Sequence, residues 1–180
     1  DGIEYFGGKV STSNVIVYGF GDDGLDIDQS YGGTISNGMV IKAAIADSGL
    51  EIDGPEGSFN ASFTLDKITL KGNSANTNRI ADYRAGARGT SKNVYVTDYP
   101  STTKVRMNDA LSSANYTAGV LAFQTWNIKA SATTGIFTDA VAGSTFPTAS
   151  FATAVSTAAA GVGADASAFG WTLAKAKGLF

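Results

Sequence analysis

The sequence Gly21-Asp22-Asp23-Gly24-Leu25-Asp26-Ile27-Asp28 contains the clearest copy of a phrase that returns about every 25 residues. Related copies are Asp1-Gly2-Ile3-Glu4 and Ser48-Gly49-Leu50-Glu51, and fainter ones surround Ile80 and Val105. A second apolar run follows each copy. Strand-rich, glycine-punctuated repeats of this length are typical of a solenoid, in which each coil stacks on its neighbours. We therefore expect a β-solenoid of about five coils over residues 1–131.

Apolar and polar residues alternate within each copy, so Leu25 and Ile27 would point toward one face of a strand and Asp26 toward the other. The second runs alternate similarly, which predicts inward positions for Val15, Val17, Met39 and Ile41. The glycine before each apolar anchor indicates a corner with positive φ. A β-sandwich or barrel is the competing interpretation, because short strands with regularly spaced turns also describe it.

Composition excludes several classes of function. The chain has 180 residues, 43% of them hydrophobic, which is enough for one continuous core. The net charge of -3 and the lack of a basic run argue against nucleic-acid binding. The absence of cysteine and histidine excludes Cys/His zinc sites, Ser-His-Asp and Cys-His mechanisms, and disulfides. No apolar run approaches the ~20 residues of a membrane-spanning helix. Because the sequence begins at Asp1 rather than at Met, we expect a processed chain.

Residues 132–180 differ from the rest, because Ala, Gly, Ser and Thr dominate and charge is sparse. We interpret them as a second, terminal segment. It would cover one end of the solenoid, whose last coil otherwise exposes unpaired strand edges, or it would pack on a neighbouring subunit.

The phrases Asp1-Gly2-Ile3-Glu4-Tyr5-Phe6-Gly7-Gly8 and Gly21-Asp22-Asp23-Gly24-Leu25-Asp26-Ile27-Asp28 resemble those of large secreted bacterial surface proteins. Those proteins are built on right-handed parallel β-helices of pectate-lyase-like architecture, and many have no assigned enzymatic activity. The resemblance implies an all-β, right-handed parallel β-helix. It also implies export, an extracellular or cell-surface location, and a structural or adhesive role.

The outward residues of the first strands predict two acidic rows, one of Glu4, Asp26 and Glu51 and one of Asp28 and Asp53. Stacked strands lie about 4.8 Å apart, so these carboxylates would repel one another unless water or a cation separates them. Ca²⁺, which prefers carboxylate and carbonyl oxygens, would remove that repulsion. In the alternative, the corner acids cap backbone amides and the outward acids are solvated. The candidate calcium ligands are Asp22, Asp23, Asp26, Asp28 and Asp53.

Two further candidates concern polysaccharides. The pectate-lyase-like architecture includes lyases, which combine calcium-bound carboxylates with a base that removes the proton α to a uronate carboxylate. Bases would come from Arg79, Arg84, Arg88 or Arg106, although surface ion pairs explain these arginines more simply. Exposed aromatic residues could stack on sugars, whereas stacking between coils is the alternative. The candidate sugar-binding residues are Phe6, Tyr31 and Tyr83.

We therefore expect an extracellular, non-enzymatic structural or adhesive β-helix protein. It would bind a surface glycan or copies of itself, the latter through the solenoid ends as a filament or surface-layer subunit. The alternative function is a calcium-dependent polysaccharide-binding or polysaccharide-lyase β-helix.

Overall fold

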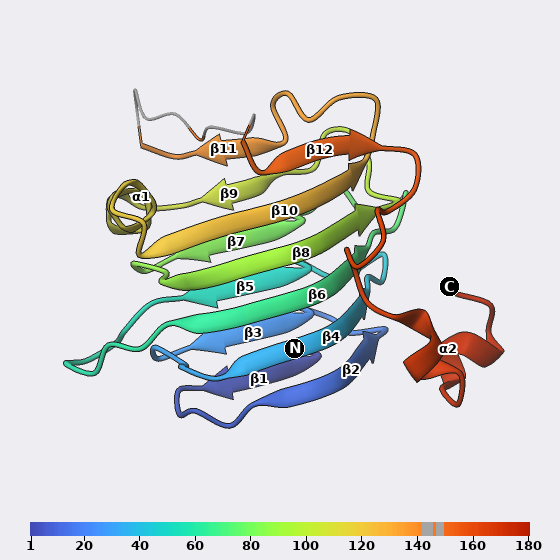
Figure 1. Ribbon diagram of the computed structural model, residues 1–180, viewed down its shortest axis with the longest axis horizontal. Helices are drawn as coiled ribbons and strands as arrows, with labels where there is room; N and C mark the ends of the chain where they lie inside the picture. Colours follow the sequence, from blue (N-terminus) through green and yellow to red (C-terminus); the bar gives the residue numbers. More distant parts are fainter. Residues whose placement is uncertain (142–145, 147–149) are drawn as a thin grey trace.

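The computed structural model describes residues 1–141, 146 and 150–180. The chain winds into a parallel β-solenoid in which each coil gives one strand to each of two six-stranded sheets (Figure 1). We call them the odd sheet and the even sheet after their strand numbers. The odd sheet contains β1 (Ile3–Phe6), β3 (Leu25–Asp28), β5 (Leu50–Asp53), β7 (Ala81–Arg84), β9 (Val105–Met107) and β11 (Phe137–Asp139). The even sheet contains β2 (Thr12–Tyr18), β4 (Thr34–Ile41), β6 (Phe63–Lys71), β8 (Gly89–Thr97), β10 (Leu121–Lys129) and β12 (Ala152–Val155).

The predicted β-solenoid is confirmed, with six coils in place of the five expected. The sixth coil arises because β11 pairs in parallel with β9 and β12 pairs in parallel with β10. The strands therefore continue past residue 131, where the sequence suggested that the repeats end. The change in composition at residue 132 marks a change of residue type within the solenoid.

The odd sheet stacks the apolar anchors of successive repeats in one inward column. Leu25 pairs with Ile3 on one side and with Leu50 on the other, and both leucines are fully buried. The prediction that Ile80 is the next anchor was wrong, because Leu50 pairs with Ala81. Ile80 instead occupies the corner before the strand and is also buried.

The glycine at the corner before β3, Gly24, is required by close packing. Gly24 does not have the positive φ that we expected. A Cβ atom there would lie 2.5 Å from the carbonyl oxygen of Gly49 and 2.4 Å from Cγ1 of Val40. Adjacent coils approach too closely at this corner for any side chain.

The even sheet departs from simple alternation, because five of its strands each contain one non-glycine residue with positive φ. This residue shifts the alternation of side chains by one position, as a β-bulge does. In β4, Gly38 and Val40 face the core, while Met39 and Ile41 face outward, so the prediction that these two point inward was wrong. The residues with positive φ are Asn14, Asn37, Lys67, Asn93 and Thr125.

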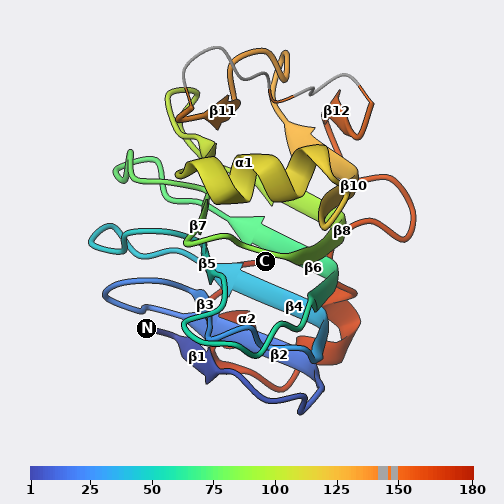
Figure 2. The ribbon, with the colours of Figure 1, turned by 90° about the vertical axis from the view of Figure 1, so that its left-hand side faces the viewer.

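Aromatic rings fill the core in the last coils. Phe123 stacks on Phe151 with ring centroids 5.4 Å apart, and the ring of Phe137 meets that of Phe151 edge-on at 5.0 Å. The helix α1 (Ala110–Thr117), whose N-cap is Asp109, lies in the corner between β9 and β10 and contacts β10 (Figure 2).

Residues 156–180, which we call the strap, run back along the outer face of the even sheet (Figure 1). They contain η1 (Ala166–Phe169) and the short helix α2 (Leu173–Ala176). Successive backbone amides of the strap bond to successive coils. Ala159 N donates to Asn127 Oδ1 (2.8 Å), Gly163 N to Asn93 O (2.9 Å), Ala164 N to Thr69 Oγ1 (2.8 Å) and Asp165 N to Asn37 Oδ1 (2.6 Å).

The strap also covers the apolar side chains that the bulges turn outward. Phe169 is fully buried and packs with Ala174 against Met39 and Ile41. The expectation that the terminal segment covers an end of the solenoid is therefore corrected for the strap, which covers the side of its own even sheet. Within the described residues, no helix is long and apolar enough to cross a membrane.

Candidate functional site

The outer face of the odd sheet carries the two predicted rows of charged residues. The register aligns Glu4 with Asp26, Asp26 with Glu51, Glu51 with Asp82, and Asp82 with Arg106. Two residues further along the strands, Phe6 aligns with Asp28, and Asp53 aligns with Arg84. We call the part of this face on β1, β3 and β5 the acidic face; it consists of Glu4, Phe6, Asp26, Asp28, Glu51 and Asp53.

In the later coils, arginines pair with the outward-facing carboxylates and neutralise their charge. Arg106 binds Asp82 with two bonds, Nη2 to Oδ2 at 2.7 Å and Nε to Oδ1 at 3.0 Å. The Asp82 side chain is only 1% exposed, and Arg79 Nε lies 3.4 Å from its Oδ2. Arg84 is shared by Asp53 (2.6 Å) and Glu51 (2.7 Å). These hydrogen bonds raise the pKa of Arg84 and of Arg106, which favours the protonated guanidinium in both.

The acidic face has no such complement around Asp26. This residue is 7% exposed, and its Oδ1 has no hydrogen-bond partner within the described residues. Burial, followed by repulsion from Asp28, Glu51 and Glu4, raises the pKa of Asp26 to about 7. Burial also raises the pKa of Glu51 to about 7, although the ion pair with Arg84 opposes the shift. Both carboxyl groups therefore lose their protons only near pH 7, and no cation of the described residues pairs with Asp26 once it is charged.

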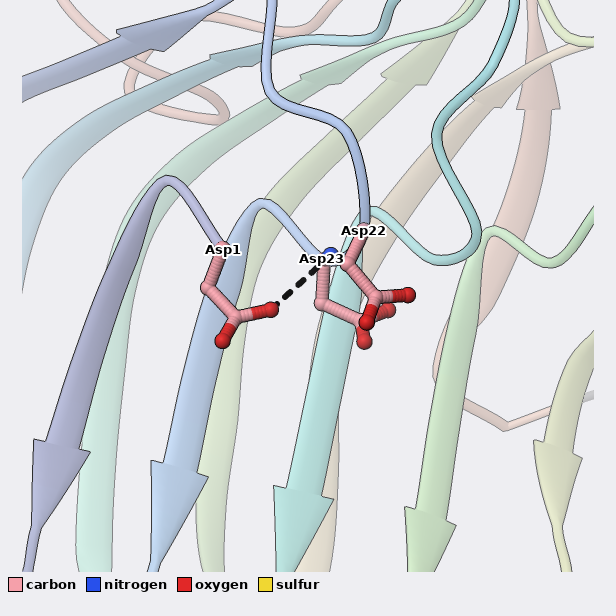
Figure 3. A group of neighbouring side chains, drawn as sticks. All are labelled: Asp1, Asp22 and Asp23. Carbon is pink, nitrogen blue, oxygen red and sulfur yellow. Dashed lines mark hydrogen bonds between the residues drawn. The ribbon is translucent and has the colours of Figure 1, made fainter.

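The five predicted calcium ligands do not form one site. Asp22 and Asp23 lie together with Asp1 at neighbouring corners, where one carboxylate oxygen from each lies within 4.8 Å of the others (Figure 3). Asp1 Oδ1 accepts a bond from the Asp23 amide (3.2 Å), and Asp23 Oδ1 accepts one from the Ser48 amide (2.7 Å). Asp23 thus caps a backbone amide of the next corner, as the alternative interpretation expected.

The other predicted ligands belong to the acidic face. Asp26 groups with Asp1 and Glu4, again with oxygens within 4.8 Å of one another. Asp53 forms an ion pair with Arg84. The pKa of Asp28 is raised chiefly by burial, then by the charges of Asp53 and Glu56, and also by a hydrogen bond with Asp53. A divalent cation would therefore find suitable oxygens at Asp26 and Glu4 rather than at Asp28 and Asp53.

Two of the three predicted sugar-binding aromatics are core residues. Tyr31 is 1% exposed and its hydroxyl donates to the Val10 carbonyl (2.6 Å), while Tyr83 is fully buried and its hydroxyl bonds to Ser91 Oγ (2.8 Å). Tyr83 points inward because it pairs with Ile52. The prediction for these two tyrosines was wrong. Phe6, by contrast, is 63% exposed on the acidic face.

Sequence reasoning missed Phe59, which lies in the loop between β5 and β6 and is 56% exposed. Beside it is a hollow of about 380 Å³ lined by Gln29, Glu56, Gly57, Ser58 and Phe59. The signal in the sequence is the longer interval between the third and fourth repeats, with one aromatic residue among Gly, Ser and Asn. This loop borders the acidic face, since the charge of Glu56 acts on Asp28.

Comparison with known protein families matches residues 1–174 to the pectate-lyase-like β-helix domain. No curated protein and no solved structure gives a significant match. The match spans both sheets and most of the strap, and it agrees with the parallel β-solenoid described above. The chain belongs to the family of pectate-lyase-like β-helix domains.

Proposed function

We propose that this protein is a non-catalytic, adhesive β-helix domain that acts outside the cell and binds a surface glycan along the acidic face. The observation that carries the proposal is the row of carboxylates beside the exposed ring of Phe6, in which Asp26 has an oxygen without a partner within the described residues. Carboxylates accept hydrogen bonds from sugar hydroxyls, and an aromatic ring packs on the apolar face of a sugar. The stacked strands hold these groups in fixed rows, which favours binding by preorganisation.

The arginines argue for binding rather than for cleavage. A lyase base must be able to accept a proton, whereas Arg79, Arg84 and Arg106 each donate to carboxylates of their own chain. Arg88 lies in the turn after β7 and donates to Asn60 Oδ1 (2.8 Å). These pairings support the proposed non-catalytic role.

Calcium-dependent binding is a second candidate, favoured by the grouping of Asp1, Glu4 and Asp26 oxygens within 4.8 Å. Ca²⁺ takes several oxygen ligands at about 2.4 Å, and three carboxylates would supply part of that shell. The ion would supply positive charge to which the carboxylates of an acidic glycan can bind. In that case Asp26 and Glu4 would hold the ion, and Phe6 would contact the sugar.

The test is binding of the full chain to an array of acidic, neutral and basic oligosaccharides, with calcium and with a chelator. We expect binding that weakens when Glu4→Gln and Asp28→Asn are combined. Asp66→Asn, on β6 of the other sheet, is the matched control and should bind normally. Lack of binding to every glycan would refute the adhesive role, and the appearance of shortened products would refute the non-catalytic one. Filament formation through the solenoid ends stays a prediction from the sequence, to be tested by negative-stain microscopy.

A further inference from the structure

The acidic face and the hollow beside Phe59 together indicate the charge of the glycan. Resting on the glycan-binding role proposed above, we infer that the ligand is a cationic glycan with free amino sugars. Its ammonium groups would lie against the carboxylates of the acidic face, and one sugar would occupy the hollow beside Phe59. This assignment requires no metal ion.

The balance of charge is the first reason. Carboxylates dominate the acidic face, and Glu56 extends them into the neighbouring loop. Arg84 is the cation that pairs with them within the described residues, and Glu51 and Asp53 already share it. A glycan of uronates would meet repulsion here, whereas a glycan of protonated amines would meet opposite charge.

The second reason is the buried oxygen of Asp26, which lacks a donor. Burying a carboxylate without a partner is costly, and a charged N–H donor is the strongest remedy. An ammonium carries three donors and no acceptor, so one group can bond to the exposed carboxylate of Glu4 and offset the charge of Asp26, whose oxygen lies within 4.8 Å of that carboxylate. The raised pKa of Asp26 agrees with the lack of a paired cation at this residue.

The third reason is the Phe59 ring, which already attracts an ammonium group. Lys9 Nζ of the same chain lies over this ring, 5.9 Å from its centroid. The negative face of an aromatic ring attracts cations in this geometry. Lys9 is exposed, so a ligand ammonium can displace it. The hollow of about 380 Å³ beside the ring offers the polar groups of Gln29, Glu56 and Ser58 to the rest of the sugar.

The loop that carries Phe59 is held in place before any ligand binds. Ser30 Oγ donates to the Ala61 carbonyl (3.1 Å) and accepts from the Ala61 amide (2.9 Å). Between Phe59 and Ala61, Asn60 Oδ1 accepts a bond from Arg88 (2.8 Å). Preformed geometry of this kind lowers the entropy lost on binding.

The test measures affinity by calorimetry for three probes, in chelator and then in calcium: a glucosamine oligosaccharide, its N-acetylated counterpart and a galacturonate oligosaccharide. The measurement is made at about pH 7, where much of the free amine is charged and where Asp26 and Glu51 begin to lose their protons. We expect the glucosamine oligosaccharide to bind in chelator, with affinity that falls as salt rises. The N-acetylated form, which has the same ring but no charge, should bind at least about tenfold more weakly.

Variants then locate the site. Glu56→Gln and Phe59→Ala should each weaken binding of the glucosamine oligosaccharide by about tenfold. Lys9→Met removes the ammonium group that competes for the Phe59 ring and should strengthen binding. Trp171→Ala, which removes an aromatic ring that is 81% exposed on the strap, is the control and should bind normally. Circular dichroism checks that each variant is folded.

The outcomes separate this inference from the function on which it rests. Equal binding of the free and N-acetylated probes, or binding of galacturonate alone and only with calcium, would overturn the cationic ligand and leave a glycan-binding protein. Normal binding by Glu56→Gln and Phe59→Ala would overturn the assigned hollow. Failure of all three probes, with and without calcium, would count against both proposals.

Discussion

Replacing Asp26 by asparagine should stabilise the fold above neutral pH, because it removes a buried negative charge from the acidic face. The carboxyl group of Asp26 is buried, and one of its oxygens has no partner within the described residues. Its pKa rises from 3.8 to about 7, chiefly because burial disfavours the charged form. An asparagine of the same shape carries no charge and can donate a hydrogen bond to Glu4 or Glu51.

The direction of the pH dependence follows from proton binding. Between about pH 4 and pH 7 the folded chain holds a proton on Asp26 that the unfolded chain has lost. The free energy of unfolding therefore falls as the pH rises through this window. The stabilising contribution is present at pH 4 and below, and it is lost once the pH exceeds about 7.

The size of the effect follows from the shift. A rise of about three pKa units corresponds to a ceiling of about 4 kcal/mol, at 1.36 kcal/mol per unit. Part of the shift comes from the charges of Asp28, Glu51 and Glu4, which relax when one of them binds a proton. We therefore expect Asp26→Asn to raise the free energy of unfolding by about 2 kcal/mol at pH 8 and to leave it nearly unchanged at pH 4.

Urea denaturation at the two pH values, in chelator, measures this difference. Glu56→Gln is the control, because it removes an exposed carboxylate of the neighbouring loop and should change stability by less than about 0.5 kcal/mol. Equal or lower stability of Asp26→Asn at pH 8 would refute the claim that this carboxylate is buried without compensation. Repeating the measurement with calcium distinguishes a bound ion, because Asp26→Asn would then lower stability.

Three further predictions concern the coils and the strap. Gly24→Ala should destabilise the fold by about 2 kcal/mol or more, because its Cβ would clash with the next coil. Gly21→Ala is the control and should be tolerated, because a Cβ at Gly21 meets no atom within 4 Å. Thermal melting of both variants measures the difference. Phe169→Ala should release the strap and expose it to proteolysis, while the strand content of the solenoid is kept. Loss of the whole β signal in circular dichroism would contradict the conclusion that the strap packs in a cluster separate from the solenoid core. Arg84→Met should lower stability more at pH 8 than at pH 5, because at pH 8 it leaves Glu51 charged and without its ion pair. Equal losses of stability at both pH values in urea denaturation would refute this.

The sequence predicted the features that depend on local repetition. Alternation around Leu25 and Leu50 fixed which residues of the odd strands face the core, because a strand repeats every two residues. That same alternation placed Glu4, Asp26 and Glu51 in one outward row. Identical corners in successive repeats implied parallel stacking, which the register confirms.

Only the tertiary structure decided the features that depend on pairing between distant segments. Met39 faces outward because Asn37 has a positive φ and shifts the alternation of side chains. The presence of an asparagine in the sequence does not by itself predict such a bulge. Tyr83 faces the core because Leu50 of β5 pairs with Ala81 of β7, one residue later than the repeat in the sequence suggests. The strap found its place on the even sheet through apolar side chains that lie over a hundred residues away in the chain. The charge state of the acidic face was also decided there, because burial and the position of Arg84 follow from how the coils stack.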